Sequence, residues 1–393
     1  MATIVLGVIS LLKGIRHPGT WPATQALLNY DHGLIKRGLF GATFGKAFHL
    51  DHYVNFTILS YLLLYVLLRL LISLTIRSGV VDRLGRGEIA ALFYSSVVIS
   101  FLGVLAGYLD IVLASLTLFL LLIRDPQKRL FTAIPVCTAA IFVHEMFLIV
   151  FLPLILFSLV LDADAMGNLK QRKLQYRLAG LLAIGCTGLA WILSSVCVVS
   201  ASVSRELMNE ASKHADFKVD PNVYDALIRT ATKNFSDMVR SYTQDSEWRM
   251  EFIVSILIFT PLTVMLVRTI GQMLEGHQGM ASRKRLFALS LCVMFAPLLL
   301  NALGSDCARW DAMVCLDGFI VLMLLCRSMP DRRLDLSVGA RNLIVLLVAI
   351  NMATGEFMMG MVPNAPGANP YPFSGAFTQF VNDVEHQNWV PPK

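Results

Sequence analysis

Charged residues are scarce in this sequence. Lys, Arg, Asp and Glu make up only 15% of the 393 residues, whereas 56% are hydrophobic, and the mean hydropathy is +0.64. Soluble domains carry about 25% charged residues, so this composition excludes an ordinary soluble protein. Runs of about 20 apolar residues, the length that crosses a bilayer, recur along the chain. We therefore predict an all-α, polytopic integral membrane protein in which residues 1–393 form a single transmembrane domain.

Cysteine pairs and phosphate-binding motifs are also missing. The seven cysteines lie in or beside apolar segments, and no two of them form a CxxC pair, so we expect buried thiols and no metal site. No Walker loop or GxGxxG is present. The formal net charge of +6 is typical of basic cytoplasmic loops. The sequence thus indicates neither a nucleotide nor a nucleic acid as partner, and the only cofactor it leaves open is a divalent cation bound by acidic side chains.

Apolar runs predict about 10–11 transmembrane helices. The first run has about 12 residues, lacks a leading positive charge and a cleavage site, and is expected to be a half-inserted or tilted helix rather than a signal peptide. The others lie near 54–76, 88–107, 109–123, 130–143, 146–161, 178–200, 251–269, 286–303, 312–326 and 338–360.

The region 130–161 is too long for one comfortable crossing. Its ionisable pair, His144 and Glu145, sits at the middle. We expect a hairpin of two short helices with this pair at its tip, and the alternative is a single long tilted helix.

Basic residues set the orientation. The connections after 76, 123, 161, 269 and 326 each carry a cluster of Lys and Arg residues and are expected to be cytoplasmic. The loop at about 13–52, the loop at about 204–249 and the tail from about 361 to 393 would then be external. This predicts a multi-pass protein of the inner, or plasma, membrane with its polar loops on the periplasmic side.

Amphipathic helices are expected in the external loops. After Asp220-Pro221, four apolar residues return at nearly helical spacing, namely Val223, Leu227, Phe235 and Met238. In the first loop, aromatic rings recur every four residues at 40, 44 and 48, and Gly41 and Gly45 would allow close helix approach.

Ionisable residues gather on this predicted external side. A charge near hydrocarbon costs a few kcal/mol, so several at one leaflet predict a polar cavity. They are Asp31, His32, Lys36 and Arg37 in the first loop, Asp110 at a helix start, His144 and Glu145 at the hairpin tip, and Asp306, Arg309 and Asp311 in one short turn.

Each of these residues also has a purely structural explanation. Asp110 could cap the helix that follows it, and His144 with Glu145 could form a solvated turn. Arg309 could pair only with the acids beside it in the turn. The two cations of the first loop could bind lipid phosphate nonspecifically.

Arginine and carboxylate side chains in one external cavity favour glycosyl transfer from a lipid-phosphate donor. The guanidinium fork matches phosphate oxygens, and a carboxylate can accept the proton of an attacking sugar hydroxyl. The leaving phosphate needs the cations, and the acceptor needs the base.

Several motifs carry a resemblance to a known class. The run YDHGLIKRGLFG (30–41) resembles a Y-D-x-G-x-x-x-R-G-L-x-G pattern in multispanning proteins of bacterial capsule and exopolysaccharide gene clusters. The same proteins have motifs that resemble three further stretches of this chain, namely LDIVLAS (109–115), VHEMFLIVFLP (143–153) and the turn containing RW (309–310). These proteins are similar in layout to GT-C polyprenyl-dependent glycosyltransferases and to Wzy-type polysaccharide polymerases.

The resemblance implies that Asp31 takes the place of the loop acid that serves as base in the GT-C class. Many members of that class have two acids separated by one residue, whereas His32 is followed by Gly33 here. The base therefore stays open between Asp31, Asp110 and Glu145.

The predicted function is an integral-membrane glycosyltransferase or polysaccharide polymerase, which transfers sugar from a polyprenyl-phosphate or polyprenyl-diphosphate donor to a glycan acceptor in cell-surface polysaccharide biosynthesis. His144 would assist the base, Arg37 with Arg309 would hold the phosphate, and Asp110 would position one of these cations. Tyr30, Lys36, Asp306, Trp310 and Asp311 complete the predicted substrate-binding set.

A transporter or flippase for a lipid-linked sugar or another anionic substrate is the alternative. Asp317, Glu356 and Arg69 lie inside apolar segments, where a carrier needs its polar groups. An enzyme instead concentrates its ionisable groups at one leaflet, and most candidates in this sequence lie there.

Overall fold

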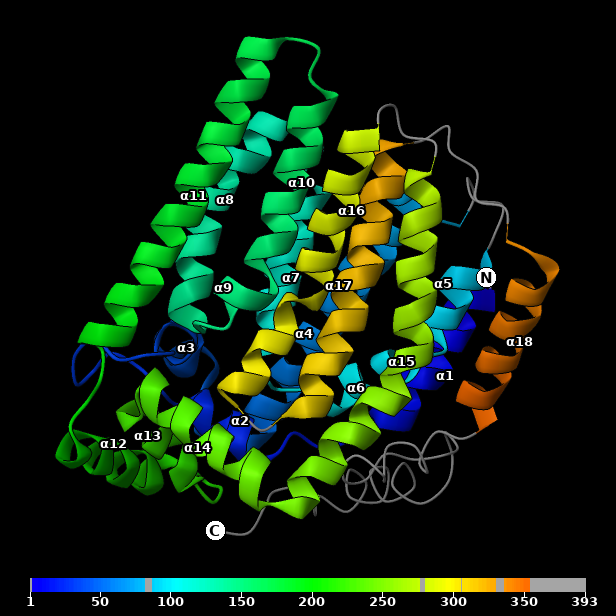
Figure 1. The fold of residues 1–393 in the computed structure, drawn as a ribbon. Coiled ribbons are helices and arrows are strands. Elements are labelled where there is room, and N and C mark those ends of the chain that lie inside the picture. Colours follow the sequence, from blue (N-terminus) through cyan, green and yellow to red (C-terminus); the bar gives the residue numbers. More distant parts are fainter. Residues whose placement is uncertain (1, 82–86, 276–279, 305, 330–335, 354–393) are drawn as a thin grey trace.

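The computed structural model describes residues 2–81, 87–275, 280–304, 306–329 and 336–353. These residues form helices and connecting loops without a strand, so the predicted all-α class is confirmed (Figure 1). The predictions for Glu356 and for the tail 361–393 lie outside the described residues.

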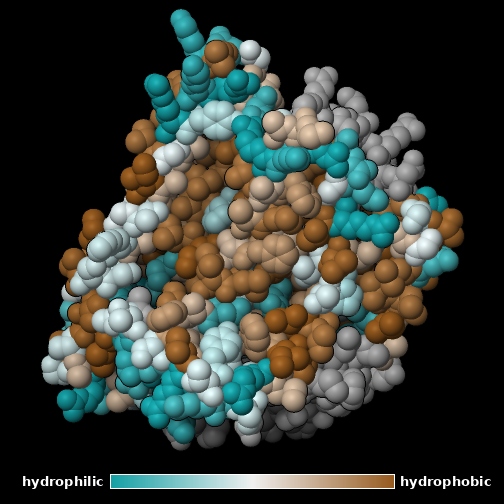
Figure 2. Space-filling model, viewed as in Figure 1, coloured by the Kyte–Doolittle hydropathy of each residue, from teal (hydrophilic) through white to brown (hydrophobic). Residues whose placement is uncertain are grey.

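Helices of membrane-spanning length run through the bundle. Figure 2 shows a broad hydrophobic belt between two hydrophilic ends, as expected for side chains that face lipid. Among the described residues, six helical stretches are long and apolar enough to cross a membrane: Tyr53–Ser78 (α4), Gly87–Val104 (α5, Gly87–Tyr94, and α6, Val97–Val104), Phe147–Ala165 (α9, Phe147–Val150, and α10, Leu152–Ala165), Leu169–Val196 (α11), Trp248–Leu274 (within α15, Ser246–Leu274) and Met280–Ala302 (α16, Met280–Phe295, and η2, Ala296–Ala302).

Shorter helices complete the bundle. α7 (Leu109–Leu122) and α18 (Val338–Ala353) are short and apolar. α1 (Ala2–Gly14), the expected short first helix, packs against α6 so closely that a Cβ on Gly14 would lie 1.7 Å from the Ser100 carbonyl oxygen. Lys13 at the end of α1 donates to the carbonyls of Asn351 and Met352 in α18, at 2.8 and 2.7 Å.

The hairpin predicted within 130–161 is confirmed. α8 (Pro126–Val143) ends where His144 adopts an extended conformation, with φ −164° and ψ 129°. The chain reverses over residues 144–146 and continues into α9 and α10. The first residue of α8 and the last residue of α10 therefore lie at the same end of the bundle (Figure 1). A single long helix is therefore wrong, and the break presents the His-Glu pair at the hairpin tip.

α17 (Cys307–Ser328) is the central helix. Its residues from Trp310 to Cys326 are buried without interruption, and α15, α16, α10, α4 and α6 surround it. Phe319 of α17 stacks on Phe93 of α5, with ring centroids 4.0 Å apart. Such continuous burial holds the first turn of α17, which carries Arg309, in a fixed place.

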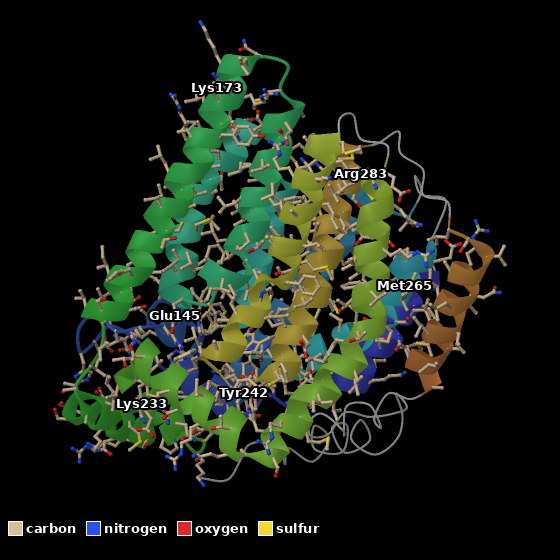
Figure 3. The ribbon with its side chains drawn as sticks, viewed as in Figure 1. Glu145, Lys173, Lys233, Tyr242, Met265 and Arg283 are labelled. Atoms are coloured by element: carbon tan, nitrogen blue, oxygen red, sulfur yellow. The ribbon has the colours of Figure 1, made fainter. Side chains whose placement is uncertain are left out.

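The bundle has two polar ends. Lys173 and Arg283 lie at one end, which we call the basic end, and Glu145 and Lys233 lie at the other (Figure 3). The second end carries residues 15–52, 144–146 and 197–245, and we call it the loop end (Figure 1).

α7 connects the two ends. At the basic end, Arg327 donates to the carbonyl of Leu121 at 2.7 Å, and Arg129 donates to the carbonyl of Ile123 at 2.6 Å. Cations at a helix C-terminus complement its dipole. The 14 residues of α7 span about 21 Å, so Asp110 in its first turn belongs to the loop end.

Helices from two distant segments form a layer over the loop end. Asp216 receives the Tyr53 backbone N–H at 2.9 Å, and the Asp220 N–H donates to the Thr24 hydroxyl at 2.9 Å. These bonds join the first loop to the second. The layer contains α2 (Thr20–Gln25), α12 (Ala201–His214), α13 (Pro221–Ile228) and α14 (Ala231–Gln244).

The single amphipathic helix predicted after Asp220 is wrong in its extent. The chain leaves α13 at Arg229, and the Thr230 hydroxyl caps α14 by accepting from the Lys233 N–H at 3.3 Å. A strong N-cap starts a new helix. The apolar residues consequently divide between two clusters: Val223 and Leu227 in one, and Met238 in the other, while Phe235 is exposed.

The aromatic series of the first loop forms as expected, but only one of its two glycines permits close packing. The rings of Phe40 and Phe44 lie 5.1 Å apart, and those of Phe44 and Phe48 lie 5.8 Å apart. They surround a π-helical turn, η1 (Gly41–Gly45), followed by α3 (Lys46–Phe48). A Cβ on Gly41 would lie 2.1 Å from the Leu28 carbonyl oxygen, whereas a Cβ on Gly45 would meet nothing within 4 Å.

Gly41→Ala is therefore expected to destabilise the protein by about 1–3 kcal/mol, the usual cost of overpacking. Gly45→Ala, four residues away, is the matched control and should leave stability unchanged or slightly raised. The apparent unfolding temperature in detergent measures both. Equal losses in the two variants would show that the chain does not pass Gly41 this closely.

Candidate functional site

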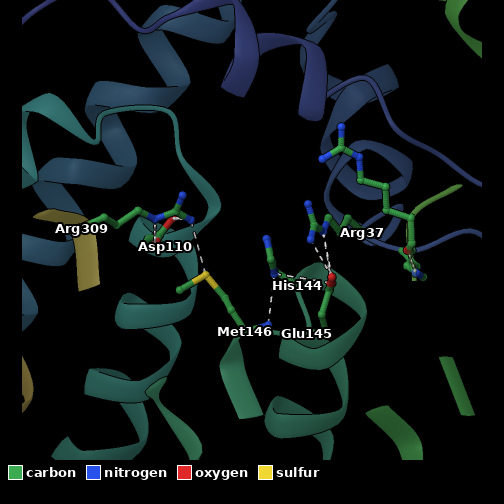
Figure 4. Close-up of polar contacts among 8 residues, drawn as sticks. Arg37, Asp110, His144, Glu145, Met146 and Arg309 are labelled. Carbon is green, nitrogen blue, oxygen red and sulfur yellow. Dashed lines mark hydrogen bonds and ion pairs between the residues drawn. The ribbon is translucent and has the colours of Figure 1, made fainter. Parts of the chain in front are cut away.

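Two arginine–carboxylate pairs lie at the loop end with His144 between them (Figure 4). The first joins Arg37 of the first loop to Glu145 of the hairpin tip. Arg37 Nη2 donates to Glu145 Oε1 at 2.6 Å, and Nε lies 3.1 Å from Oε2. Such a bidentate arrangement fixes the planes of both groups. Glu145 keeps 33% of its side chain exposed, so the pair remains open to a ligand.

The backbone of Arg37 is strained. Its φ is 62°, in the left-handed region that non-glycine residues rarely adopt, and this conformation costs about 1–3 kcal/mol. Glycine follows at position 38, where a Cβ would lie 2.5 Å from the Tyr30 ring. The turn thus has an arginine at a position where glycine or asparagine would adopt the backbone conformation at lower cost. In this conformation the guanidinium points to Glu145 at the hairpin tip.

The second pair joins α17 to α7. Arg309 Nε donates to Asp110 Oδ1 at 2.9 Å and Nη2 to Oδ2 at 2.8 Å, while Nη1 donates to Asp306 at 3.0 Å. The Arg309 guanidinium also lies 5.2 Å from the centroid of the Tyr108 ring and 4.7 Å from that of Trp310. Asp110 is 1% exposed, so this pair is shielded from water, and two rings add cation–π attraction.

These contacts decide between the explanations that the sequence left open. Asp110 pairs with Arg309. The N-cap residue of α7 is Tyr108, and its side chain makes no capping hydrogen bond. Arg309 pairs with one acid of its own turn, Asp306, but not with the other. Asp311 instead accepts from the Ser255 hydroxyl of α15, so it lies apart from the site.

Met146 bridges the two pairs. Its backbone N–H donates to His144 Nδ1 at 3.1 Å, and its sulfur lies 3.5 Å from Arg309 Nη2. Glu145 Oε2 is also 3.5 Å from His144 Nδ1, but the shorter contact with the backbone N–H requires Nδ1 to be an acceptor. The neutral ring therefore carries its proton on Nε2.

Burial and the adjacent Arg37 guanidinium lower the pKa of His144 to about 3, so the ring is neutral near pH 7. Burial alone would raise the pKa of Glu145, but the charge and hydrogen bonds of Arg37 outweigh it and lower that pKa below its ordinary value. The site thus presents an ionised carboxylate, a neutral imidazole and two guanidinium groups.

Asp31 and His32 lie elsewhere. Asp31 pairs with Lys46 at 3.2 Å and His32 with Glu210 of α12 at 2.5 Å, both in exposed surroundings. They line a cavity of about 380 Å³ between the first loop and α12. The structure therefore separates Asp31 from Glu145 and Asp110, the other two candidates for the base.

The remaining predicted residues surround the Arg37 pair or the Arg309 pair. Lys36 lines a narrow crevice with Arg37 and Glu145, and its ammonium donates to the Arg229 carbonyl at 3.2 Å. The Tyr30 hydroxyl and the Trp310 indole N–H are buried without a hydrogen-bond partner among the described residues. The Tyr30 ring packs over Gly38, and the Trp310 ring lies against the Arg309 guanidinium.

Sequence reasoning missed three residues of the site. Met146 and Tyr108 make contacts that depend on the folded chain, although Tyr108 stands two residues before Asp110 and the hairpin tip includes Met146. Arg16 is the third residue, and its guanidinium lies near Tyr108. The position of Arg16 in the first loop, beside the other predicted cations, was the signal that could have identified it.

Within the described ranges, no three His, Cys, Asp or Glu side chains are arranged to hold a metal ion. Comparisons of the chain with known protein families, curated proteins and solved structures find no match.

Asp110→Asn should destabilise the protein by about 3–5 kcal/mol, because it leaves Arg309 buried with less than its full countercharge. Asp306→Asn is the matched control, since its carboxylate is 44% exposed and such a pair contributes about 0–1 kcal/mol. Thermal unfolding in detergent measures both variants. Similar losses would contradict the assignment of Asp110 as the principal partner.

The pH dependence of stability should report His144. Its unfolded pKa is near 6.5, so below pH 6.5 the unfolded chain binds a proton that the folded protein refuses until about pH 3. Stability is therefore lost as the pH falls through this window. Between pH 7 and 5 we expect the wild type to lose about 2 kcal/mol more than His144→Asn, at 1.36 kcal/mol per pKa unit.

Asparagine at 144 cannot titrate and can still accept the Met146 N–H. His214→Asn, at an exposed position on α12, is the control and should follow the wild type. A wild-type profile that matches that of His144→Asn would show that the imidazole is not held neutral.

Proposed function

We propose that this membrane protein is a glycosyltransferase or polysaccharide polymerase that uses a polyprenyl-phosphate or polyprenyl-diphosphate sugar at the loop end. The observation that carries the proposal is the convergence of two bidentate guanidinium groups on one buried, neutral histidine (Figure 4). The excess of basic residues at the opposite end supports an external position for the site.

The Arg37–Glu145 pair is suited to an exchange of anions. A phosphate offers the same planar pair of acceptors that Glu145 provides, with more charge. When the donor phosphate takes the donors of Arg37, the Glu145 carboxylate loses the interaction that lowers its pKa. It then becomes a stronger base at the moment when the donor is bound.

Glu145 is the base that the geometry favours. Both oxygens of Asp110 are occupied by Arg309 in a dry pocket, and Asp31 lies in a different cavity. In the proposed step, Glu145 takes the proton of an acceptor hydroxyl, the oxygen bonds to the anomeric carbon, and the bond from that carbon to the phosphate oxygen breaks. The electron pair stays on the phosphate, which Arg37 stabilises by direct hydrogen bonds and Arg309 by its charge at longer range.

His144 would serve as a hydrogen-bond donor. Its Nδ1 accepts the Met146 N–H, which leaves Nε2–H for a phosphate or sugar oxygen. A neutral donor stabilises an anion without requiring a proton from solvent.

A carrier is the second candidate, and Asp317 favours it. This carboxylate is 0% exposed in the middle of α17, and neither of its oxygens has a hydrogen-bond partner within the described part of the chain. A buried acid of this kind often marks a transport pathway. Arg69, the other deep residue predicted for a carrier, is exposed on the outer face of α4 and is suited to reach the interface along its stem.

Substitutions in the full-length protein separate the two candidates. Glu145→Gln should lower sugar transfer by about 100-fold or more, the usual contribution of a general base. Arg37→Asn should weaken donor binding as well, while asparagine tolerates the left-handed backbone. The assay uses radiolabelled polyprenyl-phosphate and polyprenyl-diphosphate sugars in nanodiscs, with thermal stability as the folding control.

Asp317→Asn is the discriminating control. If the protein is an enzyme, Asp317→Asn should retain sugar transfer. If it is a carrier, Asp317→Asn should lose sugar movement across a proteoliposome membrane, and neither the wild type nor any variant should form a transfer product. Unchanged transfer in both Glu145→Gln and Arg37→Asn would refute the proposed site.

A further inference from the structure

The cavity of about 380 Å³ between the first loop and α12 is large and lies outside the two arginine pairs. One wall of the cavity is formed by residues on a single face of α12, among them Leu207, Glu210 and His214. The opposite wall comes from the first loop, including Leu28 and Asp31. The cavity therefore combines an apolar floor with polar groups at its rim.

Its charge is negative. The lining holds three carboxylates, Asp31, Asp51 and Glu210, against one ammonium, Lys46, which gives a formal charge of −2 with the histidines neutral. The hydrogen bond that His32 donates to the Glu210 carboxylate raises the pKa of His32, and protonation of that ring would bring the charge to −1. An anionic head group is repelled in either state.

The backbone around the cavity is irregular in a way that ordinary helix packing does not require. The π-helical turn η1 places Gly41 and Gly45 in the lining, and single π-turns occur frequently at functional sites. His49, also in the lining, has φ 50°, a left-handed conformation that is costly for a residue with a side chain.

We propose that this cavity binds an uncharged, hydroxyl-rich segment of a glycan. Carboxylate, imidazole and amide groups of the rim, including Asn29, can accept or donate to sugar hydroxyls, and the apolar floor suits the C–H faces of a sugar ring. The identification of this glycan as the acceptor rests on the proposed function, whereas its binding does not.

The position of the cavity fits an acceptor that continues toward Glu145. Asp31 in the cavity and Arg37 at the candidate site are six residues apart in one loop, so their Cα atoms are separated by at most about 21 Å. One loop thus contributes to a negative pocket that excludes phosphate and to a cationic site that attracts it. An oligosaccharide held in the first can present its end at the second.

Binding of defined oligosaccharides tests the proposal. The full-length protein in nanodiscs is titrated with cellotetraose, maltotetraose and tetra-N-acetylchitotetraose, with tetragalacturonate as the anionic comparison, and saturation-transfer NMR reports contact. We expect at least one neutral oligosaccharide to bind, and tetragalacturonate to bind more weakly. The double variant Asp31→Ala/Glu210→Ala should weaken neutral binding at least tenfold.

Glu206→Ala is the matched control, because Glu206 lies one turn earlier on α12 and does not line the cavity. It should bind like the wild type. The proposal is overturned if no neutral oligosaccharide binds, if tetragalacturonate binds more tightly, or if the double variant and Glu206→Ala behave alike.

The two proposals fail separately. Binding that disappears in the double variant but persists in Arg37→Asn supports the glycan pocket even if no transfer is ever detected. Transfer that depends on Arg37 and Glu145 without any oligosaccharide binding supports the proposed function and refutes the pocket.

Discussion

The buried pair between Arg309 and Asp110 is the interaction on which the loop end depends. It joins the first turn of the central helix α17 to the first turn of α7, and both oxygens of Asp110 are bonded. Burying two charges costs several kcal/mol each, and the two hydrogen bonds between Arg309 and Asp110, with the Tyr108 and Trp310 rings beside the guanidinium, offset this cost. With these contacts formed, the Arg309 guanidinium has a fixed position and a fixed charge beside the hairpin tip.

The Arg37–Glu145 pair uses the same chemistry in a different setting. Its carboxylate is 33% exposed, whereas that of Asp110 is 1% exposed. Water and ligands can compete for an exposed pair at small cost, but they cannot reach the dry one. The two arginines are therefore unequal: Arg309 is part of the framework, and Arg37 can exchange its partner.

Much of this arrangement could be predicted from the sequence. Hydropathy predicts the helices because apolar length is the dominant physical signal in a membrane protein. Basic connections place His144, Glu145, Asp110 and Arg309 at one end, because α7 and the hairpin are too short to allow another choice. The break at the hairpin tip was likewise favoured by the sequence, since an ionisable pair in the middle of a span is costly.

Partner choice was not predictable in the same way. Asp31 and Arg37 are six residues apart, but the left-handed turn at Arg37 sends their side chains to different sites. Asp306 and Asp311 flank Arg309 at similar spacing, yet only Asp306 pairs with it, because Asp311 lies on the face of α17 that packs against Ser255 of α15. These outcomes depend on helix rotation and on a single backbone dihedral, and no alternation of polar and apolar residues encodes either.

The loop 29–41 gains its importance from the same dihedral. A direct ion pair between Asp31 and Arg37, which are six residues apart, would cancel their charges. The irregular turn instead separates an acidic group from a basic one within six residues. Because Asp31 pairs with Lys46, it does not compete with Glu145 for Arg37. In the proposed function, Arg37 would exchange Glu145 for the donor phosphate, while Asp31 would belong to a pocket that repels anions.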